Sequence, residues 1–517
     1  MTFINCLEHE LNKSVCTENG ALSYKSTLSS VLDFFSKSGA LRGKKEEALE
    51  LFYKGFNEPQ NENENRINNK ILMKRALFYM RDIRKGQGER DLFRYIIHDM
   101  AINYSDEIKN LIMLIPIFGR WDDLYSFVDT PLENEAFEFM KIQFEDDLNK
   151  INEVEKNINK IQNQNSDFKD LHISLIGKWL KSINTSSKES RRLGGITRKH
   201  FKMSAKKYRK ELSKLRNVID VVECKMCKNK WEDINFERVS SNAMKRYIKT
   251  FKKHLEKEYN EYLINVKEGK AKIHSDTLYP YDIIKEYMKD SSNVCETLEL
   301  QWKNLPNYFE TNSNSICVVD TSGSMYSSEN STNIRPIDVA ISLGIYIAER
   351  NIGSFKDSFI TFSRIPELQQ IKGKTLRDKI LNIKNNDWGM NTDLIEVFKL
   401  ILSTTKKYNI SENEQIKKIF IISDMQFDRA CVKYKNSKTT FEIIDEMFKK
   451  EGIIRPELIF WNVNAYADSP IEKDKQGAYL VSGASPSILQ HALNMKEQTA
   501  MDLMLETLNS KRYNVIN

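Results

Sequence analysis

Hydrophobic positions follow two different patterns along the chain. From Leu22 to about Lys289 they recur every three or four residues, as on one face of an α-helix, in segments of about 10 to 15 residues. Two such segments are Thr27 to Phe35, with Thr27 as the N-cap, and Lys45 to Phe56. From Ser315 onward, short apolar runs alternate with helical segments. The pattern therefore predicts a multidomain α + α/β protein.

The helical segments are joined by short turns and show no strict sequence repeat. They predict an irregular HEAT-like α-solenoid over residues 21–310, in which each helical hairpin buries its apolar face against its neighbours. Within it, residues 143–167 are polar but keep one apolar seam, which predicts an extended helix in a protruding hairpin or insertion. Residues 1–20 form a separate N-terminal segment.

The second region, residues 311–517, contains six apolar runs that predict strands. They lie at 315–320, 357–362, 368–371, 418–424, 457–464 and 478–481. Helical segments separate most of them, and a helix over 499–509 follows the last. This alternation is typical of a Rossmann-like α/β domain with a mostly parallel sheet, in which ligands bind at the carboxyl ends of the strands.

Composition narrows the class of protein. Of the 517 residues, 40% are apolar and 29% are charged, as in chains with folded cores. No run of about 18 apolar residues is present, so we expect no transmembrane helix and no membrane partner. The N-terminus has neither the basic nor the apolar stretch of a signal peptide. Seven cysteines, sparse and odd in number, argue against a disulfide framework and favour a reducing, cytoplasmic location.

Cys224 and Cys227 form a Cys-x-x-Cys motif, which can be half of a zinc site. No second pair lies at a usable spacing, and His200 and His254 stand alone. We therefore interpret the motif as part of a turn between helices rather than as a metal or redox site.

The net charge of +7 is unevenly distributed. Residues 171–260 hold 24 Lys and Arg against 9 Asp and Glu, a local net of +15, so the rest of the chain carries −8. Clustered cations of this kind bind nucleic acids, because the phosphates release condensed counterions. The alternative is the solvated face of two helices; a membrane surface fits less well, because the segment lacks a strong apolar stripe. The candidate contacts are Arg191, Arg192, Arg198, Lys199, Lys202, Lys206, Lys207, Arg209 and Lys210.

A second candidate lies at a glycine-rich turn. Arg84, Lys85 and Arg90 flank Gly86-Gln87-Gly88 and could meet phosphates, and bare backbone amides at such turns also bind anions. The alternative for this turn is a helix C-cap.

An all-oxygen set of side chains falls at predicted strand ends and helix starts. Its members are Asp320, Ser322, Ser324, Thr392 and Asp424. Hard divalent cations, Mg²⁺ above all, prefer oxygen ligands with room for water. The lack of His and Cys argues against zinc. The alternative is an ordinary strand-to-helix turn capped by Asp and Ser.

This set resembles the metal-ion-dependent adhesion site of von Willebrand factor A domains, whose signature is Asp-x-Ser-x-Ser followed by a remote Thr and a remote Asp. The resemblance implies that Ser322, Ser324 and Thr392 bind the ion directly, and that the two aspartates bind it directly or through water. One position of the ion would be left for a ligand carboxylate or solvent. Asp393 is at most an outer-sphere partner, and Met425 stands where many family members have glycine.

The pairing of a helical region with such a domain is similar to the TROVE-module proteins, typified by the Ro autoantigen. It also resembles a related uncharacterised family of large DNA viruses and plants. Residues 73–90 and 115–124 carry this resemblance, the latter reading Ile-Pro-Ile-Phe-Gly-Arg-Trp-Asp-Asp-Leu. It implies a helical ring closed by the A domain, which binds single-stranded RNA ends and small non-coding RNAs in ribonucleoproteins.

Three classes of function follow. The first expectation is a non-enzymatic RNA-binding protein with a Mg²⁺ site in its A domain. The alternative is a protein-interaction scaffold whose metal site binds a carboxylate of a partner. The sequence argues against an enzyme, since it contains no P-loop, no Gly-x-Ser-x-Gly and no His-Glu-x-x-His.

Overall fold

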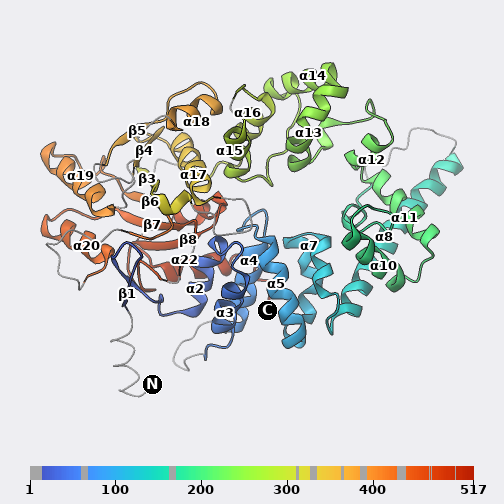
Figure 1. The fold of residues 1–517 in the computed structure, drawn as a ribbon, viewed down its shortest axis with the longest axis horizontal. Helices are drawn as coiled ribbons and strands as arrows, with labels where there is room; N and C mark the ends of the chain where they lie inside the picture. Colours follow the sequence, from blue (N-terminus) through green and yellow to red (C-terminus); the bar gives the residue numbers. More distant parts are fainter. Residues whose placement is uncertain are drawn as a thin grey trace. The chain divides into compact units, whose positions relative to one another are not determined.

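The computed structural model describes most of the chain. The described residues are 14–59, 68–161, 171–290, 292–309, 314–326, 335–361, 366–384, 393–427, 438–464, 466, 468–494 and 497–517, without the side chains of 157–161. They form two compact units (Figure 1). The α/β unit combines Met1–Leu92 with Ser275–Asn517, and the helical unit is Phe93–His274.

A six-stranded sheet forms the centre of the α/β unit. Its strands are β3 (Ser315–Val319), β4 (Ser358–Thr361), β5 (Leu368–Gln370), β6 (Lys418–Ser423), β7 (Glu457–Asn462) and β8 (Ala478–Ser482). Their order is β5-β4-β3-β6-β7-β8, and all pairs are parallel except β4 with β5. The predicted α/β region with a mostly parallel sheet is therefore confirmed.

The strand order reverses between β3 and β6, since the chain builds outward from β3 to one edge and then returns to β6. Such a switch point leaves a crevice at the carboxyl ends of the two strands, where ligands bind in open α/β sheets. Both strands are buried along their whole length, as expected of parallel strands covered on both faces. Helix α17 (Pro336–Arg350) packs against both of them.

Helices from the N-terminal part of the chain pack on this sheet. Helix α2 (Ser30–Lys37) and the C-terminal helix α22 (Ala500–Leu508) both contact β8 (Figure 1). Helices α3 (Lys45–Phe56) and α4 (Asn69–Arg81) pack on α2 in turn. The compact units thus differ from the predicted domains, because residues up to 92 group with the α/β region rather than with the helices that follow.

Two local predictions in this part were wrong. The N-cap of α2 is Ser29, whose hydroxyl accepts the amide of Leu32, and not Thr27. Leu28, predicted to lie within the helix, has a left-handed backbone with φ of 67° just before it. Thr27 is instead fully buried, and its amide donates to Asp33.

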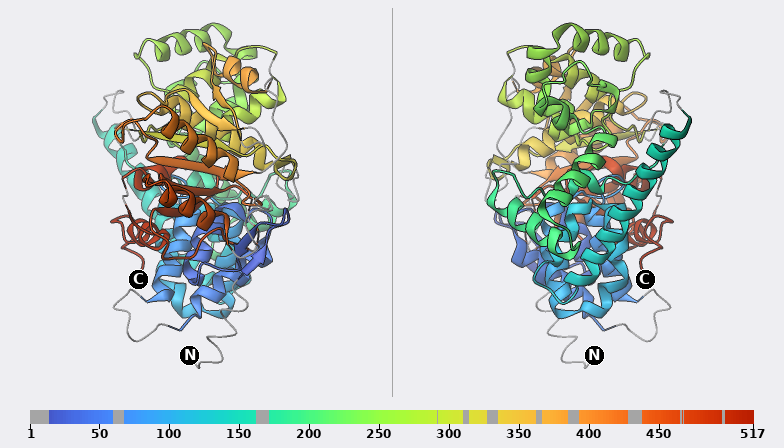
Figure 2. Two further views of the ribbon diagram at one scale, coloured as in Figure 1. Left: turned by 90° about the vertical axis from the view of Figure 1, so that its left-hand side faces the viewer. Right: turned by 90° about the vertical axis from the view of Figure 1, so that its right-hand side faces the viewer.

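The helical unit contains residues 93–274 of the predicted helical region, whereas residues 275–310 group with the α/β unit. Its main helices are α8 (Glu133–Ile161), α10 (Lys188–His200), α11 (Ala205–Val218), α12 (Val222–Cys227), α13 (Ser241–His254) and α14 (Glu256–Lys267). The predicted extended helix is confirmed as α8, which Figure 2 shows as one continuous helix. Residues 162–167 of that prediction lie outside the described residues.

The two cysteines of the Cys-x-x-Cys motif are free and lie within α12, so the prediction of a turn was wrong for them. The turn follows at Lys228, and Trp231 stacks on His254 with ring centroids 4.0 Å apart. None of the helices that the structure describes is both long enough and apolar enough to cross a membrane.

Candidate cation site and basic surface

Two aspartates meet at the switch point of the sheet. Asp320 directly follows β3 and Asp424 directly follows β6, its neighbour in the sheet. The amide of Asp320 donates to the carbonyl of Ile422 at 2.9 Å, which extends the ladder between the two strands. Both aspartates are completely buried. The strand pairing therefore brings together two carboxylates that are about a hundred residues apart in sequence.

Hydrogen bonds fix three of the four carboxylate oxygens. For Asp320, Oδ1 accepts the amide of Ser322 at 2.9 Å and Oδ2 accepts the hydroxyl of Ser423. For Asp424, Oδ1 accepts the amide of Gln426 at 3.1 Å. Its Oδ2 is buried and makes no hydrogen bond of good geometry to any described residue. The hydroxyls of Ser322 and Ser324 lie 3.1 Å apart.

The electrostatics of this pair favour a cation. The pKa of Asp424 is raised to about 7, first by burial and then by the negative charge of Asp320, whereas the nearby hydroxyl of Ser324 opposes the rise. Two buried carboxylates repel each other when both are ionised, so one takes a proton unless a cation compensates the charge. Carboxylate and hydroxyl oxygens with room for water are the donors that Mg²⁺ accepts.

The residues present fit such an ion if hydroxyl oxygens serve as ligands beside the carboxylates. In the part of the chain that the structure describes, no three His, Cys, Asp or Glu side chains converge on one point, so serine oxygens and water would have to complete the shell. The structure brings Asp320, Ser322, Ser324 and Asp424 together. Thr392 lies outside the described residues. Asp393 caps α19 (Leu394–Lys407) by accepting the amides of Ile395 and Glu396.

The backbone conformation at Met425 explains why the resemblance leads one to expect glycine after Asp424. Its backbone is left-handed, with φ of 66°, a conformation that glycine adopts at no steric cost and other residues adopt at about 1 kcal/mol. The side chain of Met425 is 3% exposed, so its packing offsets this strain. The hydroxyl of Ser423 accepts the Met425 amide at 3.0 Å and holds the turn.

Sequence reasoning missed several residues beside the site. Thr321, between two predicted ligands, has a buried hydroxyl without a hydrogen-bond partner among the described residues. The N-terminal hairpin of β1 (Ser14–Cys16) and β2 (Leu22–Tyr24) also reaches the segment after Asp424. Thr17 donates to the carbonyl of Phe427 there at 2.8 Å. Ser423 and Thr321 adjoin predicted ligands, but no sequence signal pointed to the hairpin.

In the helical unit, the basic residues of 188–216 differ in how far the fold holds them. Arg216 and Lys214 serve the fold: Arg216 binds the carbonyls of Gly177 and Leu180, and Lys214 binds Glu155. A second group is exposed and has no hydrogen bond or ion pair with any described residue. These residues, which we call the lysine face, are Lys199, Lys202, Lys206, Lys207 and Lys210.

The arginine candidates in this segment are less free. Arg191 donates to the carbonyls of Thr185 and Ser186, Arg198 to that of Met203, and Arg209 to that of Ala205. Arg192 pairs with Glu189 at 2.9 Å. These four arginines are held on the helices, whereas the five lysines point into solvent.

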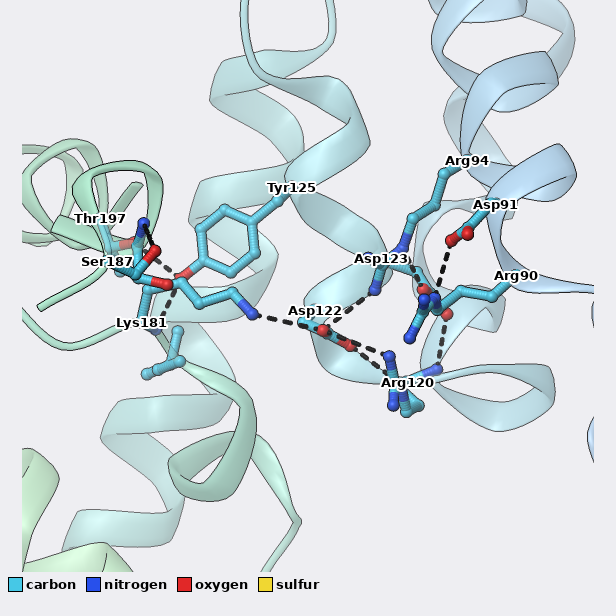
Figure 3. A network of polar contacts seen from close by, with 12 residues as sticks. Arg90, Asp91, Arg94, Arg120, Asp122, Asp123, Tyr125, Lys181, Ser187 and Thr197 are labelled. Atoms are coloured by element: carbon cyan, nitrogen blue, oxygen red, sulfur yellow. Dashed lines mark hydrogen bonds and ion pairs between the residues drawn. The ribbon is translucent and has the colours of Figure 1, made fainter. Parts of the chain in front are cut away.

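A polar network built around residues 120–125 anchors α10. Asp122 lies within 3.3 Å of the side chains of three cations, Arg94, Arg120 and Lys181 (Figure 3). Asp123 binds Arg94 at 2.7 Å and accepts the amide of Arg120.

Tyr125 extends the same network to the basic helix. Its hydroxyl accepts the amide of Lys181 at 3.0 Å and hydrogen-bonds to Thr197 of α10 at 3.0 Å (Figure 3). Tyr125, which directly follows a segment that carries part of the family resemblance, thus positions a helix of the lysine face.

The glycine-rich turn is a helix C-cap rather than an anion site. The amides of Gly86 and Gly88 donate to the carbonyl of Asp82, and those of Gln87 and Glu89 to Tyr79 and Met80 in the last turns of α4. The expectation that these amides bind an anion was therefore wrong.

The cations beside this turn lie in the α/β unit and not in the unit that carries the lysine face. Arg84, Lys85 and Arg90 are all exposed. Lys85 donates to Gln490 at 3.2 Å, and Arg90 pairs with Asp91 at 2.9 Å.

Similarity to known proteins extends along most of the chain. Residues 173–313 match the domain of unknown function DUF2828, and residues 314–514 match the domain of unknown function DUF7788. The chain is also 27% identical over 525 residues to the uncharacterized protein L728 of Acanthamoeba polyphaga mimivirus, covering 95% of this chain and 86% of that protein. These similarities fit the predicted resemblance to uncharacterised proteins of large DNA viruses, whereas the TROVE resemblance stays a prediction.

Proposed function

We propose that this protein binds RNA through the lysine face and performs no catalytic step of its own. The observation that carries the proposal is the set of five exposed lysines without a described partner, on α10, α11 and the turn between them, where the arginines are held by hydrogen bonds or ion pairs. A lysine without a partner releases counterions from the RNA when it binds a phosphate. A cation that is already paired with a carboxylate gains less free energy from the same contact. A helix surface that is charged only to keep the protein soluble would carry both positive and negative side chains.

The resemblance stated for the sequence supports RNA in particular. In this proposal the helical unit belongs to an irregular solenoid of the TROVE type, and the α/β unit is a von Willebrand factor A domain. The strand order and the two buried aspartates at the switch point support the second assignment. Asp320, Ser322, Ser324 and Asp424 would hold Mg²⁺, which would supply a fixed positive charge.

Gel-shift titration of the full chain tests the proposal. We expect both a single-stranded RNA of about 20 nucleotides and a small RNA hairpin to shift at micromolar protein in low salt, because non-specific nucleic-acid affinities alone reach roughly 10⁻⁴–10⁻⁶ M at physiological salt. Failure of both RNAs to shift would contradict the proposal.

A protein-interaction scaffold is the second candidate, and one observation favours it. The buried Oδ2 of Asp424 makes no hydrogen bond of good geometry to any described residue and is the kind of oxygen that a cation would bind, and such a cation can keep a position open for a partner's carboxylate. The variant Asp320→Ala distinguishes the two functions. If the scaffold is the function, this variant loses Mg²⁺-dependent binding of an acidic peptide while RNA binding is absent in the parent protein.

Magnesium should stabilise the protein against heat, and more at pH 8 than at pH 5.5. Folding raises the pKa of Asp424 from about 4 to about 7, so this carboxyl contributes stability that is full below about pH 4 and is lost as the pH rises through about 7. A bound cation offsets that loss at pH 8, whereas a proton competes with it at pH 5.5. Differential scanning fluorimetry with and without Mg²⁺ measures the shift.

The variant Asp424→Asn is the control, because it removes the charge and keeps the shape of the side chain. Its melting temperature should not respond to Mg²⁺ at either pH. A shift that is equal at both pH values, or unchanged in Asp424→Asn, would place the stabilising cation elsewhere.

A further inference from the structure

An open hollow lies beside the lysine face, between the start of α8 and the end of α10. Its volume is about 730 Å³, within the roughly 300–1,000 Å³ of sites that bind small ligands. On the side of α8, the side chains of Glu135 and Glu138 line it. On the other side it is lined by Lys199, His200 and Lys202. Two residues of the lysine face therefore border a space that can receive part of a nucleotide chain.

The ring of His200 is held in this hollow as a flat surface. One of its faces stacks on the buried ring of Phe137, with ring centroids 4.4 Å apart and an angle of 9° between the planes. Its Nε2 donates to Oε1 of Glu133 at 2.8 Å, which fixes the rotation of the ring within its plane. The His200 side chain is still 22% exposed. Because Phe137 covers one face, the ring surface that lines the hollow belongs to the opposite face and the remaining edge.

The two sides of the hollow carry opposite charges. Its two lysines are exposed and have no hydrogen bond or ion pair with any described residue, so they are available to a phosphate. On the other side, Glu135 pairs with Lys109 at 3.2 Å, whereas Glu138 is 59% exposed and lies 3.6 Å from Lys141. Exposed pairs contribute little to stability, so Glu138 can exchange its lysine for the N–H donors of a ligand. The hollow thus fits a ligand with an anionic end, a flat ring and N–H donors, which is the chemistry of a nucleotide.

We propose that the hollow binds one unpaired guanosine of the RNA, with the base stacked on His200 and its donor edge on Glu138. The phosphate of that nucleotide then lies against Lys199 and Lys202. The inference rests on the proposed function and names the part of the RNA that this end of the lysine face binds. In single-stranded RNA, splayed bases stack on aromatic side chains, His among them, and are read along their Watson–Crick edges.

Guanine is the base that suits a carboxylate at this position. Its N1–H and its N2 amino group are adjacent donors, and an ionised carboxylate offers two oxygens that only accept. Uracil has a single N–H between two carbonyls, which the carboxylate of Glu138 repels. The site should therefore prefer guanosine to uridine, although both bases have a face that can stack on His200.

Fluorescence anisotropy of the full chain tests this site with two labelled single-stranded RNAs of equal length, one of uridines alone and one with a single central guanosine. Wild type should bind the guanosine-containing RNA about tenfold more tightly, and Glu138→Gln should lose most of this preference. His200→Ala should bind the same RNA about tenfold more weakly than wild type, whereas His200→Phe, which keeps a ring for stacking, should retain most of the affinity. Equal affinity of wild type for the two RNAs overturns the proposal.

The matched control is His254→Ala. His254 also stacks on an aromatic ring of the helical unit, that of Trp231 at 4.0 Å, but it does not line the hollow. Its replacement should leave both affinities unchanged. An equal loss of affinity in His254→Ala and His200→Ala would overturn the proposal, because it would show that His200 has no special role.

A fluorescent base separates stacking from attraction by charge. With 2-aminopurine in place of the central guanine, binding to wild type and to His200→Phe should quench the fluorescence of the base, whereas binding to His200→Ala should not. Equal quenching by wild type and His200→Ala would overturn the proposal. If neither RNA binds wild type, the proposed function fails and this site with it, whereas two RNAs that bind equally well leave the proposed function in place and remove only this site.

Discussion

Replacing Asp122 with alanine should destabilise the helical unit by about 3–5 kcal/mol, the cost of leaving buried charges without their partner. The Asp122 side chain is 5% exposed and ion-pairs with Arg94, Arg120 and Lys181, which are themselves largely covered. Although burial opposes ionisation, these three charges hold the pKa of Asp122 below its ordinary value. Removing the carboxylate leaves three cations repelling one another around a cavity.

Urea unfolding followed by tryptophan fluorescence measures this loss, since Trp121, Trp179 and Trp231 report on the helical unit. Asp146→Ala is the control in the same unit, because Asp146 forms an exposed pair with Lys150 on α8 and its loss should leave the midpoint nearly unchanged. A midpoint for Asp122→Ala as high as that of the control would show that the network does not hold the unit together.

Reversing four charges on α11 should lower the affinity for RNA at least 100-fold at about 0.1 M salt. The variant changes Lys206, Lys207, Arg209 and Lys210 to Glu. Each reversal removes an attraction to phosphate and adds a repulsion. Because each phosphate contact also releases counterions, its loss lowers the affinity for RNA by a sizeable factor. All four side chains are exposed, so the fold should persist, which circular dichroism and thermal melting would verify.

A matched variant distinguishes the lysine face from overall charge. Lys249, Lys252, Lys253 and Lys257 on α13 and α14 are equally exposed and also without a described partner. Their reversal to Glu changes the net charge of the protein by the same amount and should cost much less affinity. An equal loss in both variants would mean that RNA is attracted by total charge and that α11 has no special role.

The sheet of the α/β unit was largely predictable, for a physical reason. A strand buried on both faces is a continuous apolar run, so the ends of β3 and β6 could be read to within about a residue, and the aspartates at those ends followed. The packing of α2 on β8 was not predictable. An amphipathic pattern shows that a face is buried, but it does not say which part of the chain covers it.

The same limit applies to the candidate site. Asp320 and Asp424 were found because motif and strand ends coincide, whereas the N-terminal hairpin meets the segment after Asp424 only through tertiary contacts between residues some 400 positions apart in sequence. The glycine-rich turn after α4 shows the opposite error, because a site was predicted there that the structure does not form. Its sequence is compatible with an anion site, and only the carbonyls that accept its amides reveal a helix cap.

The salt dependence of RNA binding, compared between wild type and a variant with all five lysines of the lysine face changed to Gln, tests the central claim most directly. Five lysine–phosphate contacts on single-stranded RNA contribute about −3.5 to the slope of log affinity against log salt concentration. Fluorescence anisotropy with a labelled single-stranded RNA should therefore give a slope shallower by about 3.5 in the variant. Equal slopes for the two proteins would contradict the account, because they would show that these lysines meet no phosphates.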